Sequence, residues 1–161
     1  MKNECTEEEG RIKAEAYCSV AERCVDDVLR KLQQWGVEED ARESIVALLV
    51  KERYIDERRY ACAFVRDKYR FNQWGRVKIS QALRMKRLAS DDISAALDEI
   101  DEDEYEAVLT SLLQKKSRSI KASNEYERNG KLVRFAASHG YDVGEILRCM
   151  KRMGCEDEFM E

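Results

Sequence analysis

Apolar residues recur at spacings of three and four along most of this chain, and that spacing is the period of an amphipathic helix. It predicts three consecutive trios of short helices. The first trio covers residues 15–23, 25–35 and 39–52, the second 57–71, 74–86 and 91–100, and the third 102–116, 123–138 and 143–152. No stretch alternates apolar and polar residues for long enough to predict a strand. The pattern therefore indicates an all-α protein.

A similar tight turn joins the second and third helices of each trio. In the first and third trios this turn contains Gly36 or Gly140, which suits the left-handed conformation that often follows a helix. Arg87 stands in the corresponding turn of the second trio. Ser90 and Asp142 are then predicted to cap the helices that follow.

The three trios predict an internal repeat. A unit of about 45 residues buries little core alone, so such units are expected to stack end to end into an elongated, curved body of three-helix modules. The expected divisions are a flexible charged tail at 1–13, repeats at 14–55, 56–100 and 101–153, and a C-terminal tail at 154–161. An ordinary all-α domain is the alternative, since amphipathic helices repeat weakly in any such protein.

Composition agrees with the helical pattern. Of the 161 residues, 39 % are charged and none is proline, which favours helices. No apolar run approaches the length of a membrane span, and the N-terminal residues lack the apolar core of a signal peptide. We therefore expect a cytoplasmic protein without membrane contact.

The cysteines and the single histidine do not form a pattern typical of a metal site. The six cysteines contain no Cys-x-x-Cys pair, and His139 has no cysteine or carboxylate pattern beside it. We expect these thiols to be buried or partly buried helix residues, with no metal and no cofactor. The chain also lacks a glycine-rich phosphate loop and other catalytic motifs, so no enzymatic activity is expected.

Charge is distributed very unevenly along the chain. The formal net charge is −4, yet ten basic residues and one acidic residue lie within positions 58–87. Nine acidic residues and no basic one follow within positions 91–106. A basic band of this kind is expected on a protein that approaches phosphates or an acidic protein surface.

Helical geometry sorts the basic band into faces. On the helix predicted over 74–86, one side is expected to face the core and carries Ile79, Ala82 and Leu83. A second side carries an exposed stripe of Arg76, Ser80, Arg84 and Arg87. A third side carries Trp74, Lys78, Gln81 and Met85.

The preceding helix, predicted over 57–71, adds further arginines. Its inward side is expected to carry Tyr60, Phe64 and Phe71, and a different side carries Arg59, Arg66 and Arg70. If the two arginine stripes are neighbours, they form one patch for DNA or a protein partner. The predicted binding residues are Arg59, Arg66, Arg70, Trp74, Arg76, Lys78, Arg84 and Arg87. The plainer alternative is a solvated face whose arginines pair with the acidic run, each pair contributing about 0–1 kcal/mol.

Two stretches of the second trio resemble a known family. Residues 54–69 read YIDERRYACAFVRDKY, and residues 74–88 read WGRVKISQALRMKRL. Together they closely resemble the middle repeat of the RecX family of recombination regulators. The positions that correspond to the family pattern are Asp56, Glu57, Arg58 or Arg59, Tyr60, Ala61, Phe64, Val65, Gly75, Ile79, Leu83, Lys86, Arg87 and Leu88. Arg87 departs from the pattern by replacing a glycine, and Cys24 by replacing a capping serine.

The resemblance implies an architecture and a partner. RecX-like proteins are built from three tandem three-helix modules and bind the RecA recombinase, especially when RecA is polymerised on single-stranded DNA. They lie in the groove of that filament and inhibit its strand-exchange and co-protease activities, and they also touch DNA. The expected function is therefore that of a non-enzymatic RecA regulator and monomer, with sequence-independent contacts to naked DNA.

Two other classes of function are open. Trios of short helices also resemble the helix-turn-helix of a DNA-binding repressor, in which the helix over 74–86 would be the recognition helix. A tandem-helix adaptor that binds only protein is the third option. A defined DNA operator would favour the repressor, whereas binding that is indifferent to sequence would favour the RecA regulator.

Overall fold

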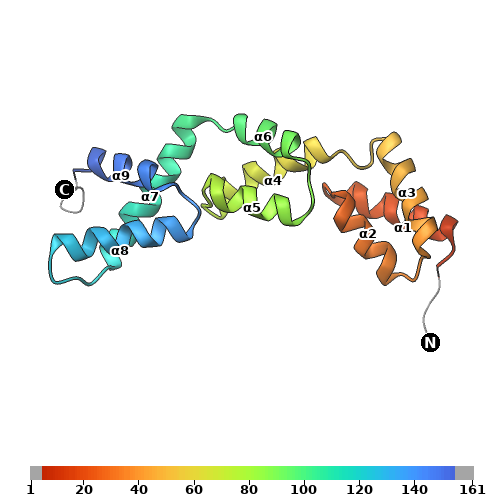
Figure 1. Ribbon diagram of the computed structural model, residues 1–161, viewed down its shortest axis with the longest axis horizontal. Helices are drawn as coiled ribbons and strands as arrows, with labels where there is room; N and C mark the ends of the chain where they lie inside the picture. Colours follow the sequence, from red (N-terminus) through yellow and green to blue (C-terminus); the bar gives the residue numbers. More distant parts are fainter. Residues whose placement is uncertain (1–4, 155–161) are drawn as a thin grey trace. The chain divides into compact units, whose positions relative to one another are not determined.

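The computed structural model describes residues 5–154, and within these residues it contains nine helices and no strand. The helices are α1 (Glu7–Val20), α2 (Val25–Gln34), α3 (Glu39–Lys51), α4 (Glu57–Phe71), α5 (Arg76–Met85), α6 (Ser90–Asp98), α7 (Glu102–Ser119), α8 (Glu125–Ser138) and α9 (Val143–Arg152) (Figure 1). The all-α prediction is confirmed. From α2 to α9, each helix begins and ends within a few residues of its predicted range.

The first helix departs most from prediction, because α1 begins well before its expected start. Thr6 caps it: the Thr6 hydroxyl oxygen accepts from the Glu9 N–H at 3.1 Å, and the Glu9 carboxylate accepts from the Thr6 N–H at 3.4 Å. Gly10 is buried, and a Cβ there would lie 2.8 Å from the Val37 side chain. Residues 7–13, predicted as part of a flexible tail, therefore belong to α1.

The chain divides into two compact units, and their boundary falls within α4 and within α5. The first unit holds the chain up to Phe64 together with Leu83–Ala96, and the second holds Val65–Ala82 together with the chain from Leu97 onward. The repeat boundaries and the curved stacking expected from the sequence stay predictions. The tail expected at 154–161 lies outside the described residues, except for Gly154.

In the first unit, α1, α2 and α3 pack against one another around a common apolar core. Figure 1 draws these helices in red and orange. The core side chains are Ala14, Val28, Leu32, Val37, Ile45, Leu49 and Ile55. Fully burying a Leu or Ile side chain contributes about 1.5–3 kcal/mol. Packing, rather than intrinsic helix propensity, therefore holds these short helices together.

In the second unit, α7, α8 and α9 pack pairwise against one another. Figure 1 draws them in the green-blue to dark blue part of the sequence. The buried residues of these helices are Tyr105, Leu109, Leu112, Leu113, Asn129, Leu132, Ala136, Ile146, Cys149 and Met150. This core supports the start of α7 and the α8–α9 turn, which both contact residues near the start of α5.

The turn between the second and third helices has the same backbone structure in every trio. In each turn one N–H donates back across the helix end: Val37 to the Leu32 oxygen at 3.0 Å, Leu88 to Leu83 at 3.3 Å, and Tyr141 to Ala136 at 3.3 Å. The residue before each donor has a positive φ: 82° at Gly36, 65° at Arg87 and 98° at Gly140. The left-handed turns predicted at the two glycines are confirmed, and Arg87 adopts the same conformation without being glycine. The internal repeat is therefore visible in the backbone.

The two helix caps predicted after these turns have different outcomes. Asp142 caps α9, because its carboxylate accepts a hydrogen bond from the Glu145 N–H at 3.2 Å. Ser90 is instead the first residue of α6, and the Ile93 N–H bonds to the carbonyl oxygen of Ala89. The predicted start of α6 was therefore one residue too late.

Two side chains face a different way from the prediction. Phe71, expected to face inward, is 80 % exposed, because the buried side of α4 follows Tyr60 and Tyr69 and the helix ends at Phe71. Ser80, expected within an exposed stripe, is only 7 % exposed. The buried side of α5 is wide enough to include both Ser80 and the adjacent Ile79. A buried serine therefore interrupts the predicted basic stripe.

Candidate partner-binding surface

The predicted binding residues are divided between the two units. Arg59, Arg84 and Arg87 belong to the first unit, and Arg66, Arg70, Trp74, Arg76 and Lys78 belong to the second. The two groups differ in their bonding partners and in their exposure. A single patch that joins all of them stays a prediction.

Arg59 is engaged in bonds within the first unit. Its Nε donates to the Glu22 carboxylate at 2.6 Å, and one terminal nitrogen donates to the Arg53 carbonyl oxygen at 3.1 Å. These bonds connect the start of α4 with the segment after α1 and the turn after α3. Arg59 therefore stabilises the first unit, which makes it a weaker candidate for binding a partner.

Arg84 and Arg87 are the exposed members of this group. Among the described residues, no ion pair or side-chain hydrogen bond engages either guanidinium. Guanidinium groups present two parallel N–H donors that fit a phosphate or a carboxylate. Both side chains are therefore available for an anionic partner.

Lys86 lies between these arginines in sequence, but its side chain bonds to another helix of the first unit. Its Nζ lies 2.8 Å from the Asp27 carboxylate of α2 and 6.0 Å from the centre of the Tyr60 ring. Burial, the largest single effect, would lower the pKa of Lys86, but the hydrogen bond to Asp27 and the attraction of Tyr60, Asp27 and Cys24 together raise it. Burial is again the largest single effect and would raise the pKa of Asp27, but the hydrogen bonds from Lys86 and from the Cys24 N–H, together with the Lys86 charge, lower it. Both groups are therefore held in their charged forms.

The acidic and basic residues that open the family motif also have structural partners. The Asp56 carboxylate accepts from the Arg59 N–H at 3.0 Å and caps α4. Glu57 accepts from the Val25 N–H at 3.1 Å, which joins the start of α4 to the start of α2. Arg58 pairs with Asp92 at 2.8 Å. This part of the motif therefore specifies how helices of the first unit are joined.

In the second unit, two predicted arginines already hold carboxylates. Arg70 pairs with Glu104 through two of its nitrogens, one of them 3.2 Å from the second carboxylate oxygen. Arg76 pairs with Glu102 of α7 and, at 3.2 Å, with Glu145 of α9. The hydrogen bond from Arg70 lowers the pKa of Glu104. Pairing between the basic band and the acidic run, the plainer alternative for these arginines, is thus present at both of them.

Tyr105 fixes the start of α5 against α7. Its hydroxyl oxygen accepts a hydrogen bond from the Arg76 N–H at 2.9 Å, and the Arg76 guanidinium lies 4.1 Å from the centre of its ring. The side chain is almost fully buried, and burial raises its pKa to about 12. Tyr105 therefore stays neutral, and its hydroxyl and its ring both hold Arg76 in position.

Trp74 carries two lysines against its ring. The ammonium of Lys78 lies 4.6 Å from the ring centre, and that of Lys68 lies 4.8 Å away. Trp74 is half-buried, and Arg66 of α4 is exposed. Lys68 was not among the predicted residues. Its contact with Trp74 depends on the turn between α4 and α5, which places the tryptophan beside the end of α4. An indole with cationic neighbours is a group that proteins use to bind single-stranded nucleic acid.

Gly75 allows the backbone before α5 to touch the α8–α9 turn. The Gly75 N–H donates to the His139 carbonyl oxygen at 2.8 Å, and the Val77 N–H donates to that of Gly140 at 3.0 Å. A Cβ on Gly75 would lie 2.4 Å from the Gly140 backbone. The glycine of the family motif is therefore required by close contact between two backbone segments.

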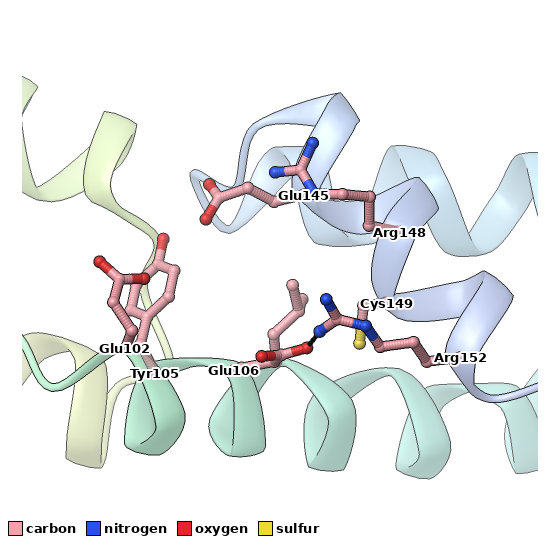
Figure 2. Close-up of a pocket in the computed structure, with 8 residues that line it drawn as sticks. Glu102, Tyr105, Glu106, Glu145, Arg148, Cys149 and Arg152 are labelled. Atoms are coloured by element: carbon pink, nitrogen blue, oxygen red, sulfur yellow. Dashed lines mark ion pairs between the residues drawn. The ribbon is translucent and has the colours of Figure 1, made fainter.

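A small cleft lies between α7 and α9 (Figure 2). Its volume is about 200 Å³, and its charged lining residues are Glu102, Glu106, Glu145, Arg148 and Arg152. Glu106 and Arg152 form an ion pair across it, and Glu102 lies farther along α7 toward its start. Glu102 and Glu145, the two carboxylates that pair with Arg76, thus both line this cleft.

The thiols and carboxylates do not assemble a reactive centre in the part of the chain that the structure describes. Cys149 lines the cleft, but it shares a hydrogen bond of 3.1 Å with the Thr110 hydroxyl, and burial raises its pKa, which disfavours the thiolate. No cluster of metal-ligating side chains occurs within residues 5–154. The described cysteines are free thiols, buried or half-buried as predicted, and Cys155 lies outside the described residues.

The fold and the exposed cationic side chains define an all-α helical-repeat protein, and family comparison then assigns it. The model for the second three-helix domain of RecX matches residues 56–97, and the model for the third matches residues 102–150. The chain belongs to the RecX family. The resemblance carried by the second trio is confirmed.

Individual relatives agree. The chain is 32 % identical over 120 residues to the regulatory protein RecX of Vibrio campbellii, covering 74 % of this chain and 76 % of that protein. It is 26 % identical over 136 residues to the regulatory protein RecX of Lactobacillus johnsonii, covering 83 % of this chain. The chain spans only 50 % of the length of that relative and 52 % of the length of the one from Oceanobacillus iheyensis.

Solved structures show the same fold. The crystal structure of RecX from Lactobacillus salivarius matches with a TM-score of 0.79 at 19 % identity, covering 92 % of this chain and 96 % of that one. A second crystal structure of a regulatory protein RecX matches with a TM-score of 0.79 at 23 % identity, covering 90 % of this chain and 73 % of that one.

Within residues 5–154, none of the helices has the length and apolar character needed to cross a bilayer.

Proposed function

We propose that this chain is a non-enzymatic regulator that binds the RecA recombinase polymerised on single-stranded DNA and inhibits it. The observation that carries the proposal is the consecutive match to the second and third RecX domain models over residues 56–97 and 102–150. Relatives of this chain bear the name regulatory protein RecX. Inhibition would act on strand exchange and on co-protease activity.

The mechanism proposed is occupancy of the filament by many weak contacts. Arg66, Arg84 and Arg87 are exposed arginines, and Trp74 adds an aromatic ring with two ammoniums close to it. Each such contact is weak at physiological ionic strength. Several contacts made by one chain along a polymer act together, because each later contact is intramolecular. A bound chain then competes with the second DNA strand and with co-protease substrates.

The test is the single-stranded-DNA-dependent ATPase of RecA, titrated with this protein. We expect the rate to fall as the protein approaches stoichiometry with the recombinase, together with strand exchange and co-protease cleavage. An unchanged rate at a clear stoichiometric excess would contradict the proposal. Footprinting on duplex DNA separates the repressor alternative, because only a repressor protects a defined operator.

A further inference from the structure

Two arginines of the candidate surface already bind anions, and those anions belong to the protein itself. Arg70 holds Glu104, and Arg76 holds Glu102 and Glu145. All of these residues lie in the second unit. The guanidinium fork that binds a carboxylate also fits a phosphate, so each carboxylate occupies the position that an external anion would take.

The carboxylates are placed where an external anion can displace them. The side chain of Glu102 is 76 % exposed and that of Glu104 is 37 % exposed. Both belong to the first turn of α7, and Glu102 also lines the cleft of Figure 2. Exposed ion pairs contribute little to stability and are screened by salt, so exchanging one anion for another costs the fold little.

The arginines, in contrast, are held in place by the structure beneath them. The Arg76 backbone is bonded to the Tyr105 hydroxyl, and its guanidinium lies over the same ring. Arg70 lies in the last turn of α4, with its guanidinium 5.7 Å from the centre of the Tyr69 ring. Displacing the carboxylates would therefore leave two fixed guanidiniums ready for another anion.

We propose that Glu102 and Glu104 are intramolecular competitors, which occupy Arg76 and Arg70 until the phosphates of single-stranded DNA displace them. This inference shares Trp74 with the proposed function and adds a regulation to it. Single-stranded DNA is the favoured ligand, because the same unit places two lysine ammoniums 4.6 and 4.8 Å from the Trp74 ring centre, and aromatic rings beside cations are used to bind single strands. The carboxylates then set a threshold: strands with many phosphates displace them, and dilute simple anions do not.

The experiment measures binding of a short fluorescent oligo(dT) by anisotropy at low salt. The variant E102Q/E104Q keeps the size of both side chains and removes both competing charges. Its affinity is expected to rise about three- to ten-fold over the parent chain, equivalent to about 0.7–1.4 kcal/mol. Circular dichroism should show unchanged helix content, since both side chains are at the surface.

The matched control is D98N/D103N. Asp98 and Asp103 are exposed carboxylates of the same unit, Asp103 in the same helical turn, and no ion pair joins either of them among the described residues. This control removes the same charge without freeing an arginine, so its affinity should rise less than two-fold. An equal gain in the control would overturn the proposal, because general repulsion would then explain the effect.

A second comparison uses the R70Q/R76Q background. There the E102Q/E104Q change has no arginine to release, so its gain in oligo(dT) affinity should disappear. Persistence of the gain would overturn the proposal, as would a failure of E102Q/E104Q to bind oligo(dT) more tightly than the parent. A gain seen only with an acidic peptide such as poly-glutamate would replace DNA by protein as the ligand and overturn it too. RecA is absent from this assay, so an inactive parent in the ATPase test would refute the proposed function and leave this inference standing.

Discussion

The two units of this protein use charged side chains in different ways. In the first unit the charged groups of Lys86 and Asp27 are held between helices, and Glu57 accepts from a backbone N–H of another helix. In the second unit Arg70 and Arg76 pair with more exposed carboxylates at the start of α7. A partly buried pair fixes helices relative to each other, whereas an exposed pair is exchanged easily. Ion pairs thus have an architectural role in the first unit and, in our proposal, an exchangeable one in the second.

The comparison also shows what the family motif encodes. Asp56 caps its own helix, Glu57 and Lys86 each bond to another helix of the first unit, and Gly75 permits a backbone contact in the second. These residues made the family recognisable, and their contacts are internal. The side chains free to bind a partner lie mainly between the motif positions, where sequence constraints from folding are weaker.

The largest effect is expected from placing a charge in the core of the second unit. Ile79→Asp puts an unpaired carboxylate at a position with no solvent exposure, so it should destabilise the protein by at least about 4 kcal/mol and unfold α5. Val77→Asp makes the same change on the same helix at a side chain that is 48 % exposed. Urea unfolding followed by circular dichroism should show a large loss for the first variant and less than about 1 kcal/mol for the second. Similar losses for both would contradict the assigned face of α5.

Removing one partner of the interior ion pair should have the next largest effect. Lys86→Met leaves the partly buried Asp27 carboxylate without its cation and should cost about 1–3 kcal/mol. Arg84→Met, at an exposed side chain of the same region, should cost less than about 0.5 kcal/mol. Equal costs in urea unfolding would mean that Lys86 is no more structural than its exposed neighbour.

The same pair predicts how stability depends on pH. The pKa of Asp27 is lowered on folding, so its contribution is present above the pKa of the unfolded carboxyl and is lost as pH falls through the folded value. The pKa of Lys86 is raised, so its contribution is present below its unfolded pKa and fades as pH rises beyond it. Unfolding free energies measured from pH 6 down to pH 3 should therefore fall less steeply in Lys86→Met than in the parent. Parallel curves would show that the pair does not shift these pKa values.

A smaller effect is expected at Arg87, where a non-glycine residue has a φ of 65°. Arg87→Gly relieves the left-handed strain and should stabilise the protein by about 0.5–1 kcal/mol. Arg87→Ala removes the same charge and keeps a Cβ in the strained conformation, so it should not stabilise. Thermal unfolding of both variants tests this. If alanine stabilises as much as glycine, loss of the charge, and not relief of strain, is the cause.

Much of the helical arrangement was predictable because its signals are local. Apolar spacing located α2 to α9, and the glycines at positions 36 and 140 located two of the turns. The early start of α1 had a local signal as well, the Thr6–Glu9 capping box. The acidic residues around it led to the prediction of a flexible charged tail instead. Local pattern was therefore sufficient wherever the interaction spans only a few residues.

The partners of the arginines were not predictable in the same way. Arg70 and Glu104 are 34 residues apart, and Arg76 and Glu102 are 26 apart, so their pairing depends on how α7 packs beside α4 and α5. Periodicity predicted which residues share a helix face, but it could not say that Ser80 would be buried. Long-range packing decides which cations are engaged and which are exposed.

The central claim is that this chain inhibits the RecA filament through exposed arginines, and one titration tests it most directly. The single-stranded-DNA-dependent ATPase of RecA is measured against the parent, R66E/R84E, and a control, K51E/K115E. Lys51 and Lys115 are exposed cations outside the proposed set, one from each unit, so the charge change is matched. The account predicts that the parent and the control inhibit alike. It predicts that R66E/R84E reaches the same inhibition only at a concentration at least about ten-fold higher, since two contacts become repulsive. Equal inhibition by all three proteins would contradict it.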